Sequence, residues 1–156
     1  MSRQESAAFE LEQAAEDLAG FIDRCSESDW QAVASVEGWT VAALAYHCAL
    51  GNDVAMSWIC SMLDQRPVRE TPETHDAFNA ADASRHSHAD RATVKEALRR
   101  SSARTVAFLR SLSDDELERS VHHGLAGREI TVGRFIGNFG RHIRDHLSSL
   151  EDAVKS

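Results

Sequence analysis

The sequence contains very little proline and few aromatic residues. Pro67 and Pro72 are the only two prolines among 156 residues, and aromatic side chains make up 6% of the chain. Proline interrupts helices, whereas aromatic and β-branched residues favour strands. Alanine, leucine, glutamate and arginine are plentiful, and all four favour helix formation. The composition therefore disfavours a β sandwich, and we expect an all-α protein.

Cysteine is also scarce, and its three occurrences form no Cys-x-x-Cys pair. The odd number formed by Cys25, Cys48 and Cys60 suits a reducing compartment better than a disulfide scaffold. The first residues lack the apolar core of a signal peptide, and no run reaches the roughly 18 apolar residues that span a bilayer. We therefore expect a cytoplasmic protein without a membrane partner.

Basic side chains are fewer than acidic ones, 17 against 25, which gives a formal net charge of −8. A general nucleic-acid binder normally carries a basic footprint, so nucleic acid is not an expected partner. Residues 120–144 nevertheless concentrate four arginines, which are Arg128, Arg134, Arg141 and Arg144. These side chains either belong to solvated helix faces or attract an anionic small molecule, and the sequence leaves both interpretations open.

Apolar periodicity predicts four helices, at about residues 6–25, 41–63 and 92–112 and from 132 onward. Thr40 is a good N-cap residue for the second helix, and Ser113 to Glu116 fit a capping box. Residues 64–90 break the pattern and predict a long crossover loop between helices two and three, with a short helix near 77–84. The predicted fold is a four-helix bundle that forms one domain over residues 1–156.

Three histidines fall on the apolar stripes of two predicted helices. His142 and His146 lie four residues apart, so their imidazoles project from one helix face. His47 lies on the stripe of the second helix, with Gly51 leaving space one turn further on. If the two helices pack together, these three side chains converge on a divalent metal and leave open coordination positions.

Other interpretations of the histidines fit less well. A single buried histidine is more often a hydrogen-bonded core residue, but three inward-facing imidazoles all gain a partner from one shared cation. A di-iron bundle needs Glu-x-x-His pairs, which this chain lacks. The His-x-x-Asp-His spacing with Asp145 is similar to the inverzincin motif, but Asp145 falls off the apolar stripe. The remaining five histidines are expected to be solvated in loops, with His122 or His123 as an alternative fourth group near the site.

The segment from Gly38 to His47 contains Trp-Thr-x-x-x-Leu-x-x-His, the segment from Asp76 to Ala80 contains Asp-x-x-Asn, and residues 131–147 end in the pair His142 and His146. In this order, the three segments resemble elements of the DinB-like superfamily of metalloenzymes, which includes the mycothiol-dependent maleylpyruvate isomerases. The resemblance covers nearly the whole chain. It implies a bundle with two parallel neighbouring helices and a divalent metal, which is Zn, Ni, Mn or Fe, on His47, His142 and His146.

The resemblance also implies a reaction class. Better-understood members are transferases or isomerases that use a low-molecular-weight thiol, so we expect thiol-dependent chemistry on a small electrophilic substrate. The alternative is a non-catalytic metal-binding or small-ligand-binding protein in a stress response. This chain lacks the additional C-terminal domain that some mycothiol-dependent isomerases carry. The sequence leaves open whether the protein forms a homodimer.

Roles follow for a few further residues. Arg128, just before the last helix, is expected to bind the acidic end of a thiol cofactor, because arginine forms bidentate contacts with carboxylates. Asp145 and Asn52 are weak candidates for a general base on position alone. Trp39 is expected to staple the loop before the second helix to the core, and Asn79 to hydrogen-bond loop backbone within the crossover.

Overall fold

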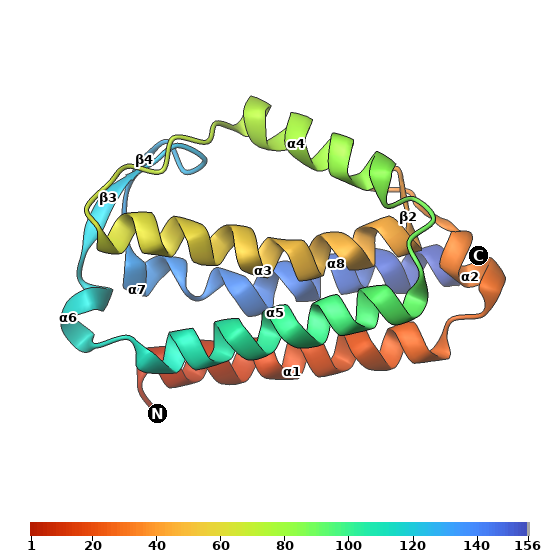
Figure 1. Ribbon diagram of the computed structural model, residues 1–156, viewed down its shortest axis with the longest axis horizontal. Helices are drawn as coiled ribbons and strands as arrows, with labels where there is room; N and C mark the ends of the chain where they lie inside the picture. Colours follow the sequence, from red (N-terminus) through yellow and green to blue (C-terminus); the bar gives the residue numbers. More distant parts are fainter. Residues whose placement is uncertain (156) are drawn as a thin grey trace.

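Four long helices lie side by side in the computed structural model, which describes residues 1–155 (Figure 1). They are α1 (Arg3–Arg24), α3 (Val41–Leu63), α5 (Arg91–Ser111) and α8 (Asn138–Val154). The first three predicted helices match these bounds to within three residues at each end, and the second matches at both ends. The all-α four-helix bundle expected from apolar periodicity is thus confirmed.

Each long helix packs against two others, so the bundle has a closed ring of contacts. α1 contacts α5 and α8, and α3 contacts the same two helices. α3 and α5 run in the same direction as neighbours, as do α1 and α8 (Figure 1). Large apolar side chains from all four helices fill the centre; they include Leu18, Leu44, Leu98 and Ile143. The expected pair of parallel neighbouring helices is therefore present. The segment that connects α3 to α5 must run the length of the bundle.

That connection contains a longer helix than the sequence predicts. α4 (Pro72–Arg85) has 14 residues, and Thr71 caps it through a reciprocal capping box with Thr74. Pro72 stands at its first position, where a missing N–H costs nothing, so this proline starts a helix instead of ending one. The short helix expected near 77–84 is therefore present, but it begins five residues earlier and leaves less loop than expected. The reason is that α4 buries only Asp82 and Ala83 and so has no apolar stripe to detect.

α4 is attached to the bundle mainly at its C-terminal end. The His86 imidazole, directly after α4, stacks on the Tyr46 ring of α3 with 3.8 Å between ring centroids. The Thr40 hydroxyl donates a hydrogen bond of 2.7 Å to the carbonyl of Ser87. The N-terminal half of α4 is largely exposed and lies above α3 (Figure 1). α4 thus forms an outer wall over this face of the bundle.

Two small hairpins were not predicted. β1 (Val33–Ala34) pairs with β2 (Trp39–Thr40), and β3 (Ser120–His123) pairs with β4 (Arg128–Thr131), both antiparallel. Gly38 and Gly127 adopt positive φ values of 75° and 65° at the two turns, a region that favours glycine. Short helices α2 (Glu27–Gln31) and α6 (Asp114–Leu117) complete the connections, and the capping box expected at Ser113 is present.

The last predicted helix is divided in two. α7 (Val132–Phe135) is followed by a turn at Ile136 and Gly137, after which α8 begins. Glycine disfavours a helix interior because it gains too much freedom when unfolded, and Gly137 supplies no side-chain cap to α8. The break separates the short helix α7, which directly follows the β3–β4 hairpin, from the long helix α8 of the bundle.

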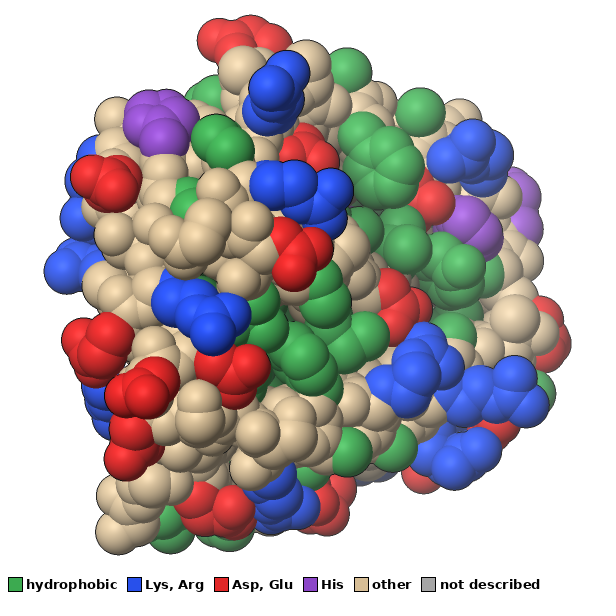
Figure 2. Space-filling view, turned by 60° about the vertical axis from the view of Figure 1, so that its left-hand side comes forward, with side chains coloured by type: hydrophobic (Ala, Val, Ile, Leu, Met, Phe, Trp, Pro, Cys, Tyr) green, Lys and Arg blue, Asp and Glu red, His purple; other side chains and the backbone are tan. Residues whose placement is uncertain are grey.

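Charged side chains of both signs are interspersed on the surface (Figure 2). Many pair between helices, as Arg110 does with Glu5 at 3.0 Å and Arg144 with Asp17 at 3.1 Å. The ion pair of Arg144 supports the interpretation of that arginine as part of a solvated face. Within residues 1–155, no helix is long and apolar enough to cross a membrane.

Two glycines on helices should respond in opposite ways to alanine. A Cβ at Gly140 of α8 would lie 3.0 Å from the carbonyl carbon of Glu10 in α1, whereas a Cβ at Gly20 meets only the flexible end of Arg24 at 3.2 Å. Gly140→Ala should therefore destabilise the protein by about 1–3 kcal/mol. Gly20→Ala should stabilise it by about 0.5–1 kcal/mol. Urea unfolding of the metal-free protein measures both, and equal stabilisation by the two changes would contradict this account of the α1–α8 contact.

Candidate metal centre

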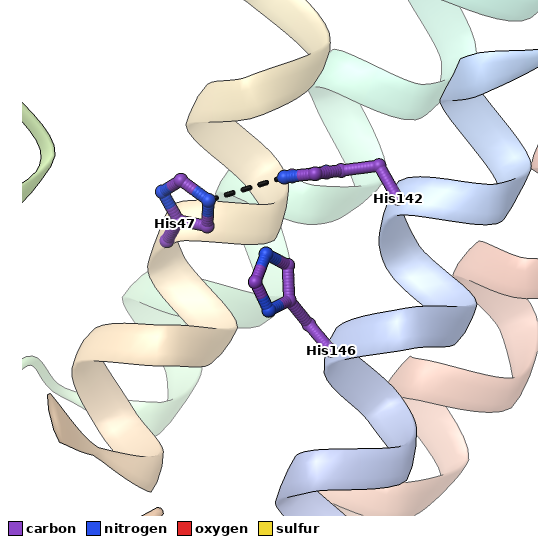
Figure 3. A group of neighbouring side chains, drawn as sticks. All are labelled: His47, His142 and His146. Atoms are coloured by element: carbon purple, nitrogen blue, oxygen red, sulfur yellow. Dashed lines mark hydrogen bonds between the residues drawn. The ribbon is translucent and has the colours of Figure 1, made fainter. Parts of the chain in front are cut away.

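The three predicted ligands converge between two helices. His47 projects from α3, and His142 and His146 project from α8 toward it (Figure 3). One nitrogen from each ring lies within 4.8 Å of the other two, and Nε2 of His47 lies 3.1 Å from Nε2 of His142. Imidazole nitrogens on one tetrahedral zinc ion, each about 2.0–2.1 Å from the metal, are separated by about 3.4 Å. The cluster thus has the dimensions of a three-His site.

Burial keeps the imidazoles of His47 and His142 uncharged. Burial, followed by the charges of His142 and His146, lowers the pKa of His47 from 6.5 to about 3. Burial, followed by His146 and His75, lowers the pKa of His142 to about 4. Both rings are therefore neutral at pH 7, and each keeps one nitrogen lone pair that could bind a cation.

Gly51 makes room for His142. A Cβ at Gly51 would lie 2.7 Å from Cε1 and 3.2 Å from Nδ1 of the His142 ring. Real Cβ atoms do not approach ring atoms this closely, so any side chain here would displace the imidazole. The space that the sequence indicated beside His47 is therefore occupied by its partner from α8.

Glu37 orients the third histidine, and the sequence reading missed it. Nδ1 of His146 lies 3.0 Å from Oε1 of Glu37. A carboxylate oxygen only accepts hydrogen bonds, so Nδ1 donates and the lone pair of Nε2 faces the cluster. Metal-binding histidines commonly donate their second nitrogen to a carboxylate, which fixes the ring and increases its basicity. Glu37 lies in the turn of the β1–β2 hairpin, where it follows no periodic pattern that could have indicated its role.

Trp39 supports the site from the same hairpin. Its ring meets the His47 imidazole edge-on, with 5.3 Å between centroids and an angle of 66°. The sequence placed Trp39 as a staple between loop and core, and its partly buried ring does pack against the core. The contact with His47 gives the Trp39 ring a second role, because it limits rotation of the His47 imidazole.

The donor set fits a borderline divalent cation. Three imidazole donors suit Zn²⁺, Ni²⁺ or Fe²⁺, and the carboxylate that contacts His146 matches the outer shell of such sites. The second carboxylate oxygen of Glu37, Oε2, is buried and has no hydrogen-bond partner within the described chain. A positive charge at the three histidines would stabilise that negative charge through the His146 ring.

A cavity of about 290 Å³ begins at the histidines. His47 and His142 line one end of it, and Trp58, His75 and His123 line it further along α3. The histidine expectations need correction here, because His123 is only 2% exposed and lines the cavity, whereas His122 is exposed. His75 is half-buried on α4 and contacts Trp58, with 5.5 Å between ring centroids.

Asn79 also differs from its expected role. It lies within α4 rather than in irregular loop, and it lines the cavity. Among residues 1–155, its side chain has no hydrogen bond to loop backbone. Its place in the crossover helix therefore makes it part of the cavity wall.

The remaining site candidates do not join the histidines. Asn52 lines the cavity, but its amide nitrogen donates to the hydroxyls of Ser101 (3.1 Å) and Ser102 (3.2 Å), which ties α3 to α5. Asp145 is exposed on α8 and is absent from the cavity wall. Arg128 is exposed on β4 and lines a separate surface depression. Its role toward an acidic thiol stays a prediction.

Metal content should depend on the cluster. We expect about one divalent ion per chain in protein purified without an affinity tag, because three imidazole donors converge. His142→Ala removes one donor without disturbing the core, so metal should be lost while the helical circular dichroism persists. Elemental analysis of the dialysed proteins is the measurement. His122→Ala, which removes an exposed histidine, is the matched control, and equal metal in wild type and His142→Ala would contradict the site.

Glu37 should tune metal affinity without binding the ion. Glu37→Gln keeps the shape but removes the negative charge, so we expect metal affinity to fall about 10- to 100-fold. Competition with a chromophoric chelator gives the affinity. Glu27→Gln, at an exposed residue paired with Arg91, is the control and should leave affinity unchanged. Unchanged affinity in Glu37→Gln would show that the Glu37–His146 hydrogen bond does not act on the metal.

Comparison with known proteins places the chain in a family. The family model described as the DinB superfamily matches residues 10–150. The structure is also similar to that of YfiT from Bacillus subtilis, with a TM-score of 0.81 and 19% identity, covering 99% of this chain and 89% of that one. YfiT is described as a probable metal-dependent hydrolase with an unusual four-helix bundle topology. No curated protein matches the sequence significantly. The match over most of its length shows that the chain belongs to the DinB superfamily.

Proposed function

We propose that this protein is a divalent-metal-dependent enzyme that activates a nucleophile at His47, His142 and His146. The nucleophile then attacks a small electrophile held in the adjoining cavity. One observation carries this proposal: three imidazoles converge where His47 and His142 line one end of a largely apolar cavity. Three protein ligands leave at least one coordination position open, which is the arrangement of catalytic rather than structural sites.

The residues of the chain supply binding, orientation and exclusion of water. A divalent ion held by the three histidines would lower the pKa of a water or thiol beside it, so that a nucleophile exists near neutral pH. Glu37 fixes the orientation of His146 through its hydrogen bond. Apolar side chains such as Val54 and Phe139 form the cavity wall next to the histidines and keep bulk water away. Because the wall contains no carboxylate among the described residues, positive charge at the site, rather than a carboxylate base, would activate the nucleophile.

Two nucleophiles fit this site. The resemblance of three sequence segments to thiol-using enzymes favours a low-molecular-weight thiol, with transfer or isomerisation as the reaction. The similarity to YfiT, described as a probable hydrolase, favours water as the second candidate. The metal is Zn, Ni, Mn or Fe in either case. A non-catalytic metal-binding or small-ligand-binding protein is the remaining alternative, and the absence of turnover would distinguish it.

Turnover assays should separate these functions. Protein loaded in turn with Zn²⁺, Ni²⁺, Mn²⁺ or Fe²⁺ is given a chlorodinitrobenzene with one of several thiols, and separately a nitrophenyl ester without thiol. We expect thiol-dependent turnover with at least one metal, and its loss in His142→Ala, because that variant cannot hold the ion. Consumption of thiol and release of nitrophenol are the measurements.

Each outcome selects one function. Ester cleavage without thiol consumption would favour the hydrolase and contradict thiol transfer. Bound metal without either reaction would contradict the enzyme proposal and favour a binding protein. His122→Ala serves again as the control, since it should retain full turnover.

A further inference from the structure

The wall of the cavity beside the histidines carries no charged side chain among the residues that the structure describes. None of its 18 lining residues is a lysine, arginine, aspartate or glutamate. The charged side chains around it lie outside the wall: the guanidinium of Arg141 donates to the side-chain oxygen of Asn138, and the charge of Glu70 acts on His123. Charged ligands lose much of their hydration on entering an apolar site and need an opposite charge there. The wall therefore favours an uncharged ligand.

Size and aromatic character narrow the ligand further. The volume of about 290 Å³ lies at the low end for small-molecule sites. Four aromatic side chains contribute to the wall: Trp58, Phe78, Phe135 and Phe139. His47 and Trp58 lie 11 residues apart on α3, which corresponds to about 16 Å along the helix axis. A flat, elongated molecule with one or two rings suits these dimensions better than a peptide or a nucleotide.

His123 provides a specific polar group in the part of the cavity away from His47 and His142. Its ring stacks on Phe135 with 5.2 Å between centroids and meets Trp58 edge-on at 5.3 Å. Both of its ring nitrogens are buried and have no hydrogen-bond partner in residues 1–155. Burying a polar group without a partner is destabilising, so a ligand that hydrogen-bonds to His123 would recover free energy. Burial also lowers the pKa of His123, so the ring is neutral and offers both a donor and an acceptor.

We propose that the cavity binds an uncharged aromatic compound whose reactive group lies at His47 and His142 and whose hydroxyl or carbonyl hydrogen-bonds to His123. The reactive end rests on the function proposed above. The selection for an uncharged ring and the role of His123 rest on the cavity wall alone. His123 is accordingly a specificity-determining residue, and the metal ligands are not needed for ligand selection.

Binding to the metal-free protein tests this proposal separately from catalysis. Titration calorimetry compares a naphthol with naphthalene carboxylate and with aminomethylnaphthalene, which are similar in size but carry opposite charges at pH 7. We expect the naphthol to bind at least about tenfold more tightly than either charged compound, because only the charged compounds must be desolvated without a partner. In the zinc-loaded protein, we expect the same order of affinities among ligands that do not coordinate zinc.

Variants of neighbouring histidines test the distal contact. His123→Leu should weaken naphthol binding by about tenfold and leave naphthalene binding unchanged, because only one hydrogen bond is lost. His123→Gln keeps hydrogen-bonding groups and should retain most of the affinity, and it still decides the question if His123→Leu does not fold. His122→Leu, at the next residue of β3, is the matched control and should bind like wild type.

Several results would overturn the proposal. They are equal or tighter binding of a charged analogue, equal weakening by His122→Leu and His123→Leu, or no binding of any aromatic compound. If the naphthol binds more tightly than the charged compounds but no turnover is detected, only the proposed enzyme function is contradicted. If turnover is detected but the naphthol does not bind more tightly, only the proposed class of substrate is contradicted.

Discussion

The approach of α8 to α3 at Gly51 is the contact on which the arrangement of the candidate site depends. The missing Cβ lets the His142 ring lie against the backbone of α3, where its Nε2 reaches 3.1 Å from that of His47. The two nitrogens form a hydrogen bond, and burial together with the neighbouring histidines lowers the pKa of both rings, so neither is charged at pH 7. The bundle core, which holds the two helices in register, keeps the two imidazoles at this distance.

The parallel direction of α3 and α5 explains the outer wall of the cavity. An antiparallel pair can be joined by a few residues, whereas parallel neighbours need a connection as long as the helices themselves. In this protein the connection includes α4, which is attached near Tyr46 and His86 and leaves its N-terminal half above the cavity. The same topological requirement that lengthens the chain also places Phe78 and Asn79 opposite the buried face of α3.

The sequence contains the bundle and the ligand set in forms that periodicity can detect. The long helices have apolar stripes, and His142 and His146 share a face because they are four residues apart. α4 has no such stripe, and strands of two to four residues are too short to show alternation. Glu37 and His123 acquire their roles through contacts with residues far along the chain, His146 and Trp58, so neither could be found from local pattern. Tertiary packing alone assigns those residues to the site.

The division of the site between helices and connections has an evolutionary consequence. The three clustered histidines are held by the bundle core, whereas much of the cavity wall comes from α4 and the β3–β4 hairpin. Substitutions in connecting segments disturb a core less than substitutions within it. Descendants of this protein can therefore change which ligand the cavity accepts through changes in two surface segments, while the histidine cluster and the stability of the bundle are inherited intact.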